Sequence, residues 1–296
     1  MVGIIILNYN GSDDTLECIS TIKKNIKCEY RIIVVDNNSK KDEAKKLSTL
    51  DEADVVVIYH NENGGYAVGN NIGIRYALKF GCDYLCILNN DTIIEEDFLT
   101  PCVSYLNKYP NVGFIGPAIL NILGNEVQST GGDIVIKKGI VTQKNNGMPY
   151  EKLQNIIDCD YVSGACMICR ASLIEKIGCI PEQYFLFFEE TEWCYKAIKY
   201  GKKNLILGDT YIRHKESASI SKVGSLKDYL MTRNRVVFVR RNANMVVYIS
   251  FLLYAFLQAS YRAIRYDCGY WHHISYLWDG ITNRINKRFP FIKVCD

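Results

Sequence analysis

Acidic and carboxamide side chains follow two apolar runs of this sequence, at the points where those runs end. Asp36 comes directly after residues 31–35, and an Asn-Asn-Asp triplet at 89–91 follows residues 84–88. A carboxylate at such a place can accept hydrogen bonds from a base or a ribose. A carboxylate beside amide oxygens suits a hard divalent cation that also holds phosphate oxygens. A helix cap and a turn residue are the simpler alternatives for Asp36 and Asp91.

Three carboxylates, Glu189, Glu190 and Glu192, follow an aromatic run at the start of a helix predicted over about residues 190–200. The helix dipole favours acidic residues in a first turn, so two of the three need no further function. A carboxylate next to aromatic side chains can nevertheless have its pKa raised toward the range that suits a general base. The spacing therefore allows a base in this segment without identifying it.

A histidine and a glycine-containing loop are further candidates for binding a metal ion or a ligand. Neutral imidazole binds first-row divalent ions well, so His214 and Asp91 together could form a metal site, although a single histidine is more often structural. Two glycines at 64 and 65 follow Asn63 and would allow the backbone to approach a ligand closely.

Alternating strand and helix patterns in the first hundred residues would bring these side chains together. Apolar runs rich in β-branched residues predict buried parallel strands over residues 3–7, 31–35, 54–58 and 84–88. Segments with helical spacing lie between them, and this alternation predicts a doubly wound α/β sheet, whose ligands bind at the carboxyl ends of the strands. No G-x-G-x-x-G follows the first strand, which argues against the dinucleotide fold of an oxidoreductase.

After residue 101 the pattern changes to strands and turns without a linker, so the second half should continue the same sheet with a hairpin. Strands are predicted over residues 112–119, 134–141, 161–169 and 205–207. The chain is predicted to be helical from about residue 226 onward. The expected organisation is a body of residues 1–221, with halves of about 1–100 and 101–221, and a helical C-terminal region of residues 222–296.

The charge is small overall and unevenly distributed. The 35 basic and 32 acidic residues give a net charge of +3, too small to make the whole chain a nucleic-acid binder. Residues 222–296 hold 12 basic and 4 acidic residues, a net charge of +8, whereas residues 1–221 carry a net charge of −5. The N-terminus lacks the features of a signal peptide, so a cytoplasmic location with reduced cysteines is expected.

The basic region contains an apolar run of 13 residues at 245–257, shorter than the ~20 that a spanning helix needs. Arginines flank the run, and Tyr270, Trp271, Tyr276 and Trp278 follow it. This pattern predicts a helix that docks the protein peripherally on the anionic inner face of a membrane. The alternative is an ordinary helix buried against the body or against a second subunit of a homo-oligomer.

In this order the motifs resemble those of glycosyltransferase family 2, particularly its bacterial rhamnosyltransferase-like branch, over roughly residues 2–240. The segments that carry the resemblance are I-I-I-L-N-Y-N at 4–10, V-D-N-N-S at 35–39, N-G-G-Y-A-V-G-N-N at 63–71, L-N-N-D at 88–91, V-S-G-A-C at 162–166, F-F-E-E-T-E at 187–192 and Y-x-x-x-R-N at 229–234. Two positions depart from the family pattern. Asn89 replaces the first Asp of the family's D-x-D motif, and Glu190 stands where the family has its catalytic Asp.

The resemblance implies a GT-A fold, in which a Rossmann-like mixed sheet is flanked by helices, here with a helical C-terminal tail. It assigns the catalytic base to Glu190, with Glu189 as a rival because the extra methylene group displaces the carboxylate. It assigns a Mg²⁺ or Mn²⁺ ion to Asp91, His214 and Asn89. The residues that it implies at the nucleotide-sugar donor are Asn8, Asp36, Asn38, Asn63, Gly64, Gly65, Asn70, Asn90 and Arg233.

The implied activity is inverting transfer of a sugar from a nucleotide diphosphate donor to a hydroxyl group of a glycan or lipid-linked acceptor, in cell-surface polysaccharide synthesis. A sugar-1-phosphate nucleotidyltransferase is one alternative, but it should have a basic, glycine-rich loop after the first strand, and residues 8–11 contain no basic residue. A non-catalytic nucleotide-binding scaffold on a membrane surface is the other alternative. It would explain the basic tail but leave the strand-end carboxylates without a function.

Overall fold

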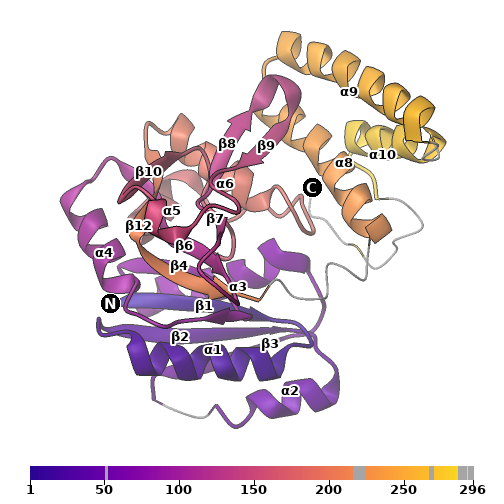
Figure 1. Ribbon diagram of the computed structural model, residues 1–296. Coiled ribbons are helices and arrows are strands. Elements are labelled where there is room, and N and C mark those ends of the chain that lie inside the picture. Colours follow the sequence, from indigo (N-terminus) through magenta and orange to yellow (C-terminus); the bar gives the residue numbers. More distant parts are fainter. Residues whose placement is uncertain (51–52, 216–223, 267–269, 286–291, 293–296) are drawn as a thin grey trace.

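A large mixed β-sheet runs through the body of the molecule (Figure 1). The computed structural model describes residues 1–50, 53–215, 224–266, 270–285 and 292. In this part of the chain the strands lie in the order β10 (Ile156–Cys159), β12 (Lys203–His214), β6 (Val112–Asn121), β11 (Cys166–Arg170), β4 (Tyr84–Asn89), β1 (Val2–Asn8), β2 (Tyr30–Asn37) and β3 (Val55–His60). Two short strands outside this order, β5 (Thr92–Ile93) and β7 (Val127–Ser129), pair with β12 and β6 respectively.

The N-terminal half is the predicted doubly wound unit. β1 pairs in parallel with β2 and with β4, and β2 pairs in parallel with β3. The helices α1 (Ser12–Asn25), α2 (Lys41–Leu47) and α3 (Gly65–Phe80) connect these strands. The apolar residues of β1 and β2 are almost completely buried, as expected of parallel strands that lie between two layers of helices. The predicted α/β fold class and the four parallel strands are therefore confirmed.

The second half continues the sheet, with β11 antiparallel to β4 and β12 parallel to β6. One predicted strand was wrong. Residues 134–141 form a hairpin of β8 (Gly132–Val135) and β9 (Ile140–Gln143), joined by the 3₁₀ turn η1 (Ile136–Lys138). Gly139 makes this reversal possible because it has a φ of +55° and packs against Arg235 and Phe251, leaving no room for a side chain.

Helices cover both faces of the sheet. On one face α1 and α4 (Leu99–Lys108) pack against the strands through residues such as Ile22 and Leu106. On the other face α3, α5 (Ala171–Ile177) and α6 (Glu189–Lys199) pack through residues such as Ile74 and Trp193. The sheet is thus shielded on both sides, and its polar strand ends are left as the place for chemistry.

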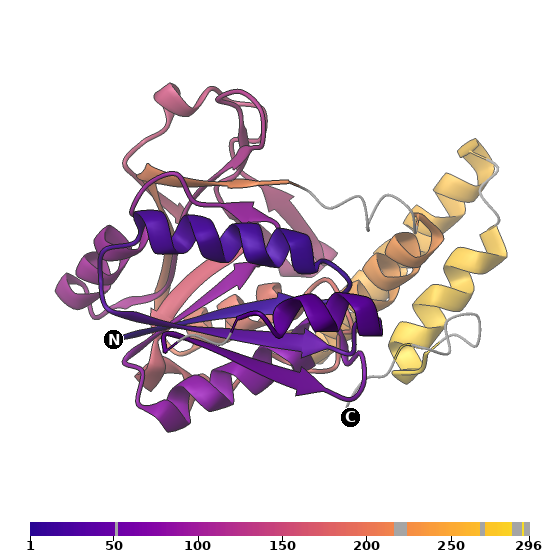
Figure 2. The ribbon, with the colours of Figure 1, turned by 90° about the horizontal axis from the view of Figure 1, so that it is seen from below.

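Three C-terminal helices, α8 (Gly224–Asn242), α9 (Met245–Tyr266) and α10 (Tyr270–Thr282), form a layer of their own beside the sheet (Figures 1 and 2). They pack around Tyr184 and Phe188, which precede α6. The predicted helical tail is confirmed in the described residues, while the predicted boundary at 221–222 lies outside them. Among the helices described, none is long and apolar enough to cross a membrane.

Gly65, the first residue of α3, occupies a position that only glycine fits. Its φ is +79°, and a side chain there would come within 2.2 Å of the Phe185 carbonyl oxygen. That oxygen accepts a hydrogen bond of 3.0 Å from the backbone N–H of Tyr66. The sequence predicted that this glycine lets the backbone approach a ligand. In the structure the backbone at Gly65 approaches Phe185, in the segment that leads into α6.

The Gly65→Ala substitution should lower the free energy of unfolding by more than a left-handed backbone alone explains, because the added methyl group collides with the Phe185 carbonyl. Gly81→Ala is the matched control, since Gly81 has a φ of +87° and nothing within 4 Å of an added methyl group. The control should lose only the conformational cost of about 1–2 kcal/mol. Urea denaturation of both variants measures the difference, and equal losses would contradict the close contact.

Candidate active site

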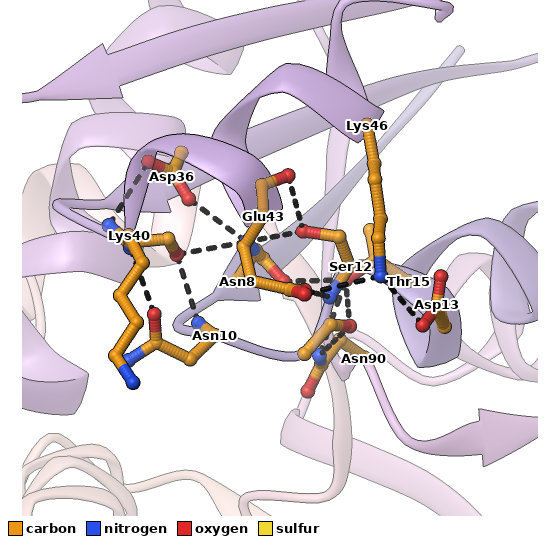
Figure 3. A network of polar contacts seen from close by, with 12 residues as sticks. Asn8, Asn10, Ser12, Asp13, Thr15, Asp36, Lys40, Glu43, Lys46 and Asn90 are labelled. Carbon is orange, nitrogen blue, oxygen red and sulfur yellow. Dashed lines mark hydrogen bonds and ion pairs between the residues drawn. The ribbon is translucent and has the colours of Figure 1, made fainter.

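Asn8 is the centre of a buried polar network at the carboxyl ends of β1 and β2 (Figure 3). The strand register sets Asn8 opposite Asp36, and Asn8 Nδ2 donates a hydrogen bond of 2.8 Å to Asp36 Oδ1. The Thr15 hydroxyl donates to Asn8 Oδ1 at 2.9 Å, and the Ser39 backbone N–H donates to Asp36 Oδ2 at 3.2 Å. Asn8 is 0% exposed and Asp36 is 2% exposed. Asn8 therefore fixes the carboxylate of Asp36 and offers no surface of its own.

Asn90 joins the same network from the end of β4. Its Nδ2 donates to the Gly11 carbonyl at 3.0 Å and to Thr15 Oγ1 at 3.1 Å. Figure 3 shows Asn8, Thr15 and Asn90 turned toward one another from three separate segments. The ends of β1 and β4 are thereby tied to the first turn of α1.

A second carboxamide cluster joins β2 to the loop before α3. Asn37 Nδ2 donates to Asn63 Oδ1 at 3.0 Å and to the Gly65 carbonyl at 3.1 Å, while the Gly64 N–H donates to Asn37 Oδ1 at 3.3 Å. These contacts hold the predicted residues 63–65 beside the end of β2, next to Asp36. Asn37 was not among the predicted site residues, because only a contact across 26 positions of sequence reveals its role.

Asn38 and Asn70 differ in their surroundings. Asn38 is exposed and has a φ of 64°, a left-handed conformation that asparagine tolerates better than most residues. Asn70 is buried in α3, where its Nδ2 donates to the Tyr66 carbonyl at 3.0 Å. Its Oδ1 has no hydrogen-bond partner in the described part of the chain. A buried acceptor in that state costs about 1–3 kcal/mol.

His214 lies against Asp91 and Asn89, the three residues predicted to hold a metal ion. His214 Nε2 is 3.1 Å from Asp91 Oδ1 and 3.3 Å from Asn89 Nδ2. On the other side of the ring, His214 Nδ1 is 2.8 Å from Gln128 Oε1. Because an amide oxygen can only accept, Nδ1 carries the proton in this contact. A cation between Nε2 and Asp91 would be held by the Nε2 lone pair, which this orientation of the ring leaves available. Gln128, on β7, was not predicted.

The pairing of β12 with β5 brings His214 to this position. His214 lies opposite Thr92 in the antiparallel register, and the Lys215 N–H donates to the Asp91 carbonyl at 3.0 Å. Asn89 and His214 are 125 positions apart in the sequence. The residue types indicated this site, but the ladder between two distant segments assembles it.

The donor set fits a hard divalent cation. Two ligands that each lie ~2.1 Å from one ion at a right angle are about 3 Å apart, close to the 3.1 Å between Asp91 Oδ1 and His214 Nε2. Among the described residues, no three His, Cys, Asp or Glu side chains are grouped to hold a metal ion. Further ligands would therefore come from Asn89, from water or from a bound phosphate group.

Glu189 and Glu190 begin α6 and differ in exposure. Glu189 is 2% exposed and Glu190 is half-buried, and Oε2 of each lacks a hydrogen-bond partner among the described residues. Burial raises the pKa of Glu190 above the ordinary glutamate value. Burial together with the negative charge of Glu190 raises the pKa of Glu189 well above that value. Glu190 is thus the less buried of the two carboxyl groups, and burial favours the protonated form of both.

Residues Gly164 and Ala165 lie between the start of α6 and the metal ligands. A methyl group at Gly164 would come within 3.6 Å of Glu190 Cγ, and the Tyr66 hydroxyl donates to the Gly164 carbonyl at 2.7 Å. The Asn89 N–H donates to the Ala165 carbonyl at 2.9 Å. Glu190 and Asn89 therefore flank the same two-residue segment, which brings the predicted base close to the predicted metal site.

Arg233 is buried away from solvent in α8. Its guanidinium donates to the carbonyls of Gln183 and Arg284 and to the side-chain oxygens of Asn234 and Asn283, at 2.7–3.2 Å. It is 0% exposed. The predicted contact with the donor is not part of this geometry, in which Arg233 supports the segment before α6.

A comparison with known protein families agrees with this arrangement. Residues 3–178 match the family described as Glycosyl transferase family 2. The matched part contains the ends of β1, β2 and β4 and residues 164–165, and it ends before α6 begins.

Two curated relatives cover most of the chain. The low-salt glycan biosynthesis hexosyltransferase Agl10 of Haloferax volcanii is 30% identical over 215 residues, which are 71% of this chain and 65% of Agl10. The dTDP-rhamnosyl transferase RfbF of Shigella flexneri is 22% identical over 261 residues, 80% of this chain and 79% of RfbF. This chain thus spans somewhat less than two thirds of the length of Agl10.

The fold is shared with a solved structure, the mannosyltransferase PcManGT from Pyrobaculum calidifontis in complex with GDP-Man and Mn²⁺. The TM-score is 0.60 at 13% identity, and the match covers 95% of this chain and 86% of PcManGT. The predicted GT-A type fold, a mixed sheet flanked by helices, is therefore confirmed. With a family match that spans more than half of its residues, the chain belongs to glycosyl transferase family 2.

Proposed function

We propose that this protein is an inverting glycosyltransferase that moves a sugar from a nucleotide diphosphate donor to a hydroxyl group of a glycan or lipid-linked acceptor. The observation that carries the proposal is the meeting of Asp91 and His214 at the end of β4, across residues 164–165 from Glu190. Agl10 is named for glycan biosynthesis and RfbF for dTDP-rhamnosyl transfer. On that basis we assign the reaction to the synthesis of a cell-surface polysaccharide.

The donor nucleotide binds along the ends of β1, β2 and β4 in this proposal. Asp36, held by Asn8, accepts hydrogen bonds from the base, and Asn38 and residues 63–65 border the same edge. Asn70 contributes the buried Oδ1 that has no partner among the described residues. Asn90 supports this network through its hydrogen bonds to Gly11 and Thr15.

A Mg²⁺ or Mn²⁺ ion suits the ligands Asp91 and His214, with Asn89 beside them. Such an ion would neutralise the negative charge that develops on the departing diphosphate. Gln128 keeps the His214 ring in the orientation and tautomer that leave Nε2 available. That PcManGT was solved with both GDP-Man and Mn²⁺ supports the same combination here.

Glu190 acts as the general base in this mechanism. Its carboxylate accepts the proton of the acceptor hydroxyl while the hydroxyl oxygen attacks the anomeric carbon of the sugar. The bond from that carbon to the diphosphate breaks on the opposite face, and the nucleoside diphosphate departs with the bonding electrons. A single direct displacement of this kind inverts the configuration at the anomeric carbon.

If Asp91 and His214 hold the cation, Asp91→Ala and His214→Ala should each weaken donor binding mainly when Mn²⁺ is present, because the diphosphate loses its bridging ion. Titration of the donor with and without Mn²⁺ measures this effect. Gln128→Leu should weaken the affinity for Mn²⁺ by roughly 10-fold or more, because the His214 ring would no longer be held in its orientation. Asp97→Ala removes a carboxylate that caps α4 and should change nothing in these titrations. Metal-dependent affinity that is the same in every variant would remove this site from the proposal.

Glu190→Gln keeps the shape of the side chain but removes the proton acceptor, so kcat should fall by roughly 10²-fold or more with little change in donor binding. Because burial raises the pKa of Glu190, kcat of the unaltered enzyme should fall as the pH drops through that raised pKa. Glu189→Gln is the matched control and should retain kcat. A loss in Glu189→Gln instead would show that the base is one residue earlier.

The same preparations separate the proposal from its two alternatives. A glycosyltransferase slowly releases free sugar and nucleoside diphosphate from the donor when no acceptor is present. A sugar-1-phosphate nucleotidyltransferase or a nucleotide-binding scaffold would not release these products. Chromatography of the donor after long incubation distinguishes the classes.

We also propose that α9 docks the protein on an anionic membrane surface. The exposed side of α9 carries apolar residues at helical spacing, with 54–88% exposure: Val246, Ile249, Leu253, Leu257 and Ile264. The opposite side, which includes Phe251 and Ala255, is buried against α8 and α10. Burial, one of the two alternatives left open by the sequence, thus applies to one side of this helix, and we propose docking for the exposed side.

Positive charge accompanies the exposed apolar stripe. α9 contains no acidic residue, and exposed Arg240 and Arg265 lie near its two ends. Lys138 of η1 lies 5.9 Å from the ring of Tyr254 on α9. Apolar and cationic side chains in this combination suit an anionic bilayer better than a second copy of the same basic surface. The side chains of the predicted contributors Arg262, Tyr270 and Trp271 lie outside the described residues.

Co-sedimentation with liposomes tests the docking. The protein should pellet with anionic vesicles at low salt and less at high salt, because ions screen the contribution of each surface cation. A Leu253→Gln/Leu257→Gln variant should lose binding, whereas Leu123→Gln should keep it, since Leu123 is even more exposed but lies between β6 and β7. Protein that stays in the supernatant throughout, or a dimer that the α9 variant dissolves, would contradict membrane docking.

A further inference from the structure

The two residues before α6 adopt a backbone conformation that their side chains disfavour. Phe187 has a φ of 71° and Phe188 a φ of 76°, in the left-handed region that bulky residues rarely enter. Phe188 is also the residue that caps the start of α6. The backbone at Phe187 and Phe188 therefore determines how the first turn of α6, which carries Glu190, is oriented.

Asn234 of α8 holds this turn through its backbone carbonyls. Asn234 Nδ2 donates to the Leu186 carbonyl at 2.9 Å and to the Phe187 carbonyl at 3.0 Å. These carbonyls belong to the two peptide groups on either side of Phe187. Because Asn234 is 0% exposed, no water competes for its amide, and the contacts fix both peptide planes.

Arg233 orients that amide. Its Nη1 donates to Asn234 Oδ1 at 2.7 Å and to the Gln183 carbonyl at 3.0 Å. A guanidinium group has only donors, so Asn234 must turn its oxygen toward Arg233 and its nitrogen toward the turn. The hydrogen bonds of Arg233 in the described residues all go to neutral oxygens, which indicates that it was not placed there to pair with a carboxylate.

The opposite side of the same segment is held by α3. The Phe185 carbonyl accepts from the Tyr66 N–H and lies close to Gly65, as described above. Residues 183–188 are thus held from two directions, by the start of α3 and by α8. Strain that persists only under such restraint is common where a functional group must be aimed.

We propose that Asn234, oriented by Arg233, is a positioning residue for the catalytic base. It keeps the turn at Phe187 left-handed and so keeps Glu190 half-buried against Gly164, on the acceptor side of the site. The inference rests on the proposed role of Glu190. It gives Arg233 a part in the reaction through the turn before α6 and without contact to the donor.

The Asn234→Leu substitution tests this role, because leucine has a similar volume but no donor. We expect kcat to fall roughly 10-fold to 100-fold, as a misplaced catalytic group would produce. The KM for the donor should change by less than about 3-fold, since the strand ends that bind it do not contact Asn234. Glu190 would also become less buried, so the acid limb of the kcat profile should move to lower pH.

Asn204→Leu is the matched control. Asn204 is also buried, and it bonds the Phe114 N–H, the Asp160 carbonyl and the carbonyl of Cys194, which lies in the middle of α6 and not at the turn. It should lower the melting temperature while leaving kcat per folded enzyme and the acid limb unchanged. A general loss of stability therefore cannot imitate the expected result.

Folded Asn234→Leu enzyme with the original kcat and acid limb would overturn the proposal. If that variant does not fold, Asn234→Ser, which retains one donor, should show a smaller loss of kcat and a smaller shift, and unaltered behaviour there would also overturn it. Failure of the base assignment is separate: Glu190→Gln would then retain kcat whatever Asn234 does.

Discussion

The pairing of β12 with β5 is the interaction on which the candidate site depends. It sets His214 opposite Thr92 and so beside Asp91, although the segments are more than a hundred positions apart. β12 also pairs with β6 and β10, so the strand that carries the proposed metal ligand His214 is fixed in the centre of the second half of the sheet. The sheet therefore holds His214 in a fixed position relative to Asp91.

Buried carboxamides hold the groups that carry charge. Asn8 fixes Asp36, Gln128 fixes His214 and Asn234 fixes the turn before Glu190. A carboxamide can donate and accept at once without adding a charge, so it can be buried beside a functional group with less effect on that group's ionisation than a charged side chain would have. Asp36 and His214 are thus each held by a neutral side chain that adds no charge beside them.

The C-terminal helices pack against the body of the protein on one side and are exposed on the other. α8 supplies Arg233 and Asn234 to the segment before α6, and α9 buries Phe251 in the same cluster while exposing a stripe that includes Leu253. A helix that is apolar around most of its surface must find two apolar surroundings. The protein interior provides one of them, and we assign the membrane as the other.

The sequence by itself determined the four parallel strands of the first half and the types of residue at their ends, because hydrophobic periodicity and buried strands are local properties. The fold class and the family followed from those patterns and from the order of the motifs. Only the tertiary structure decided which residues meet: Gln128 behind His214, Phe185 against Gly65, and Asn234 at Phe187. Each of these contacts joins segments that lie far apart in the chain, and their partners are fixed by packing and by the need to satisfy buried polar groups. The same reason explains why Arg233, which the motif resemblance placed at the donor, is buried where it supports the segment before α6.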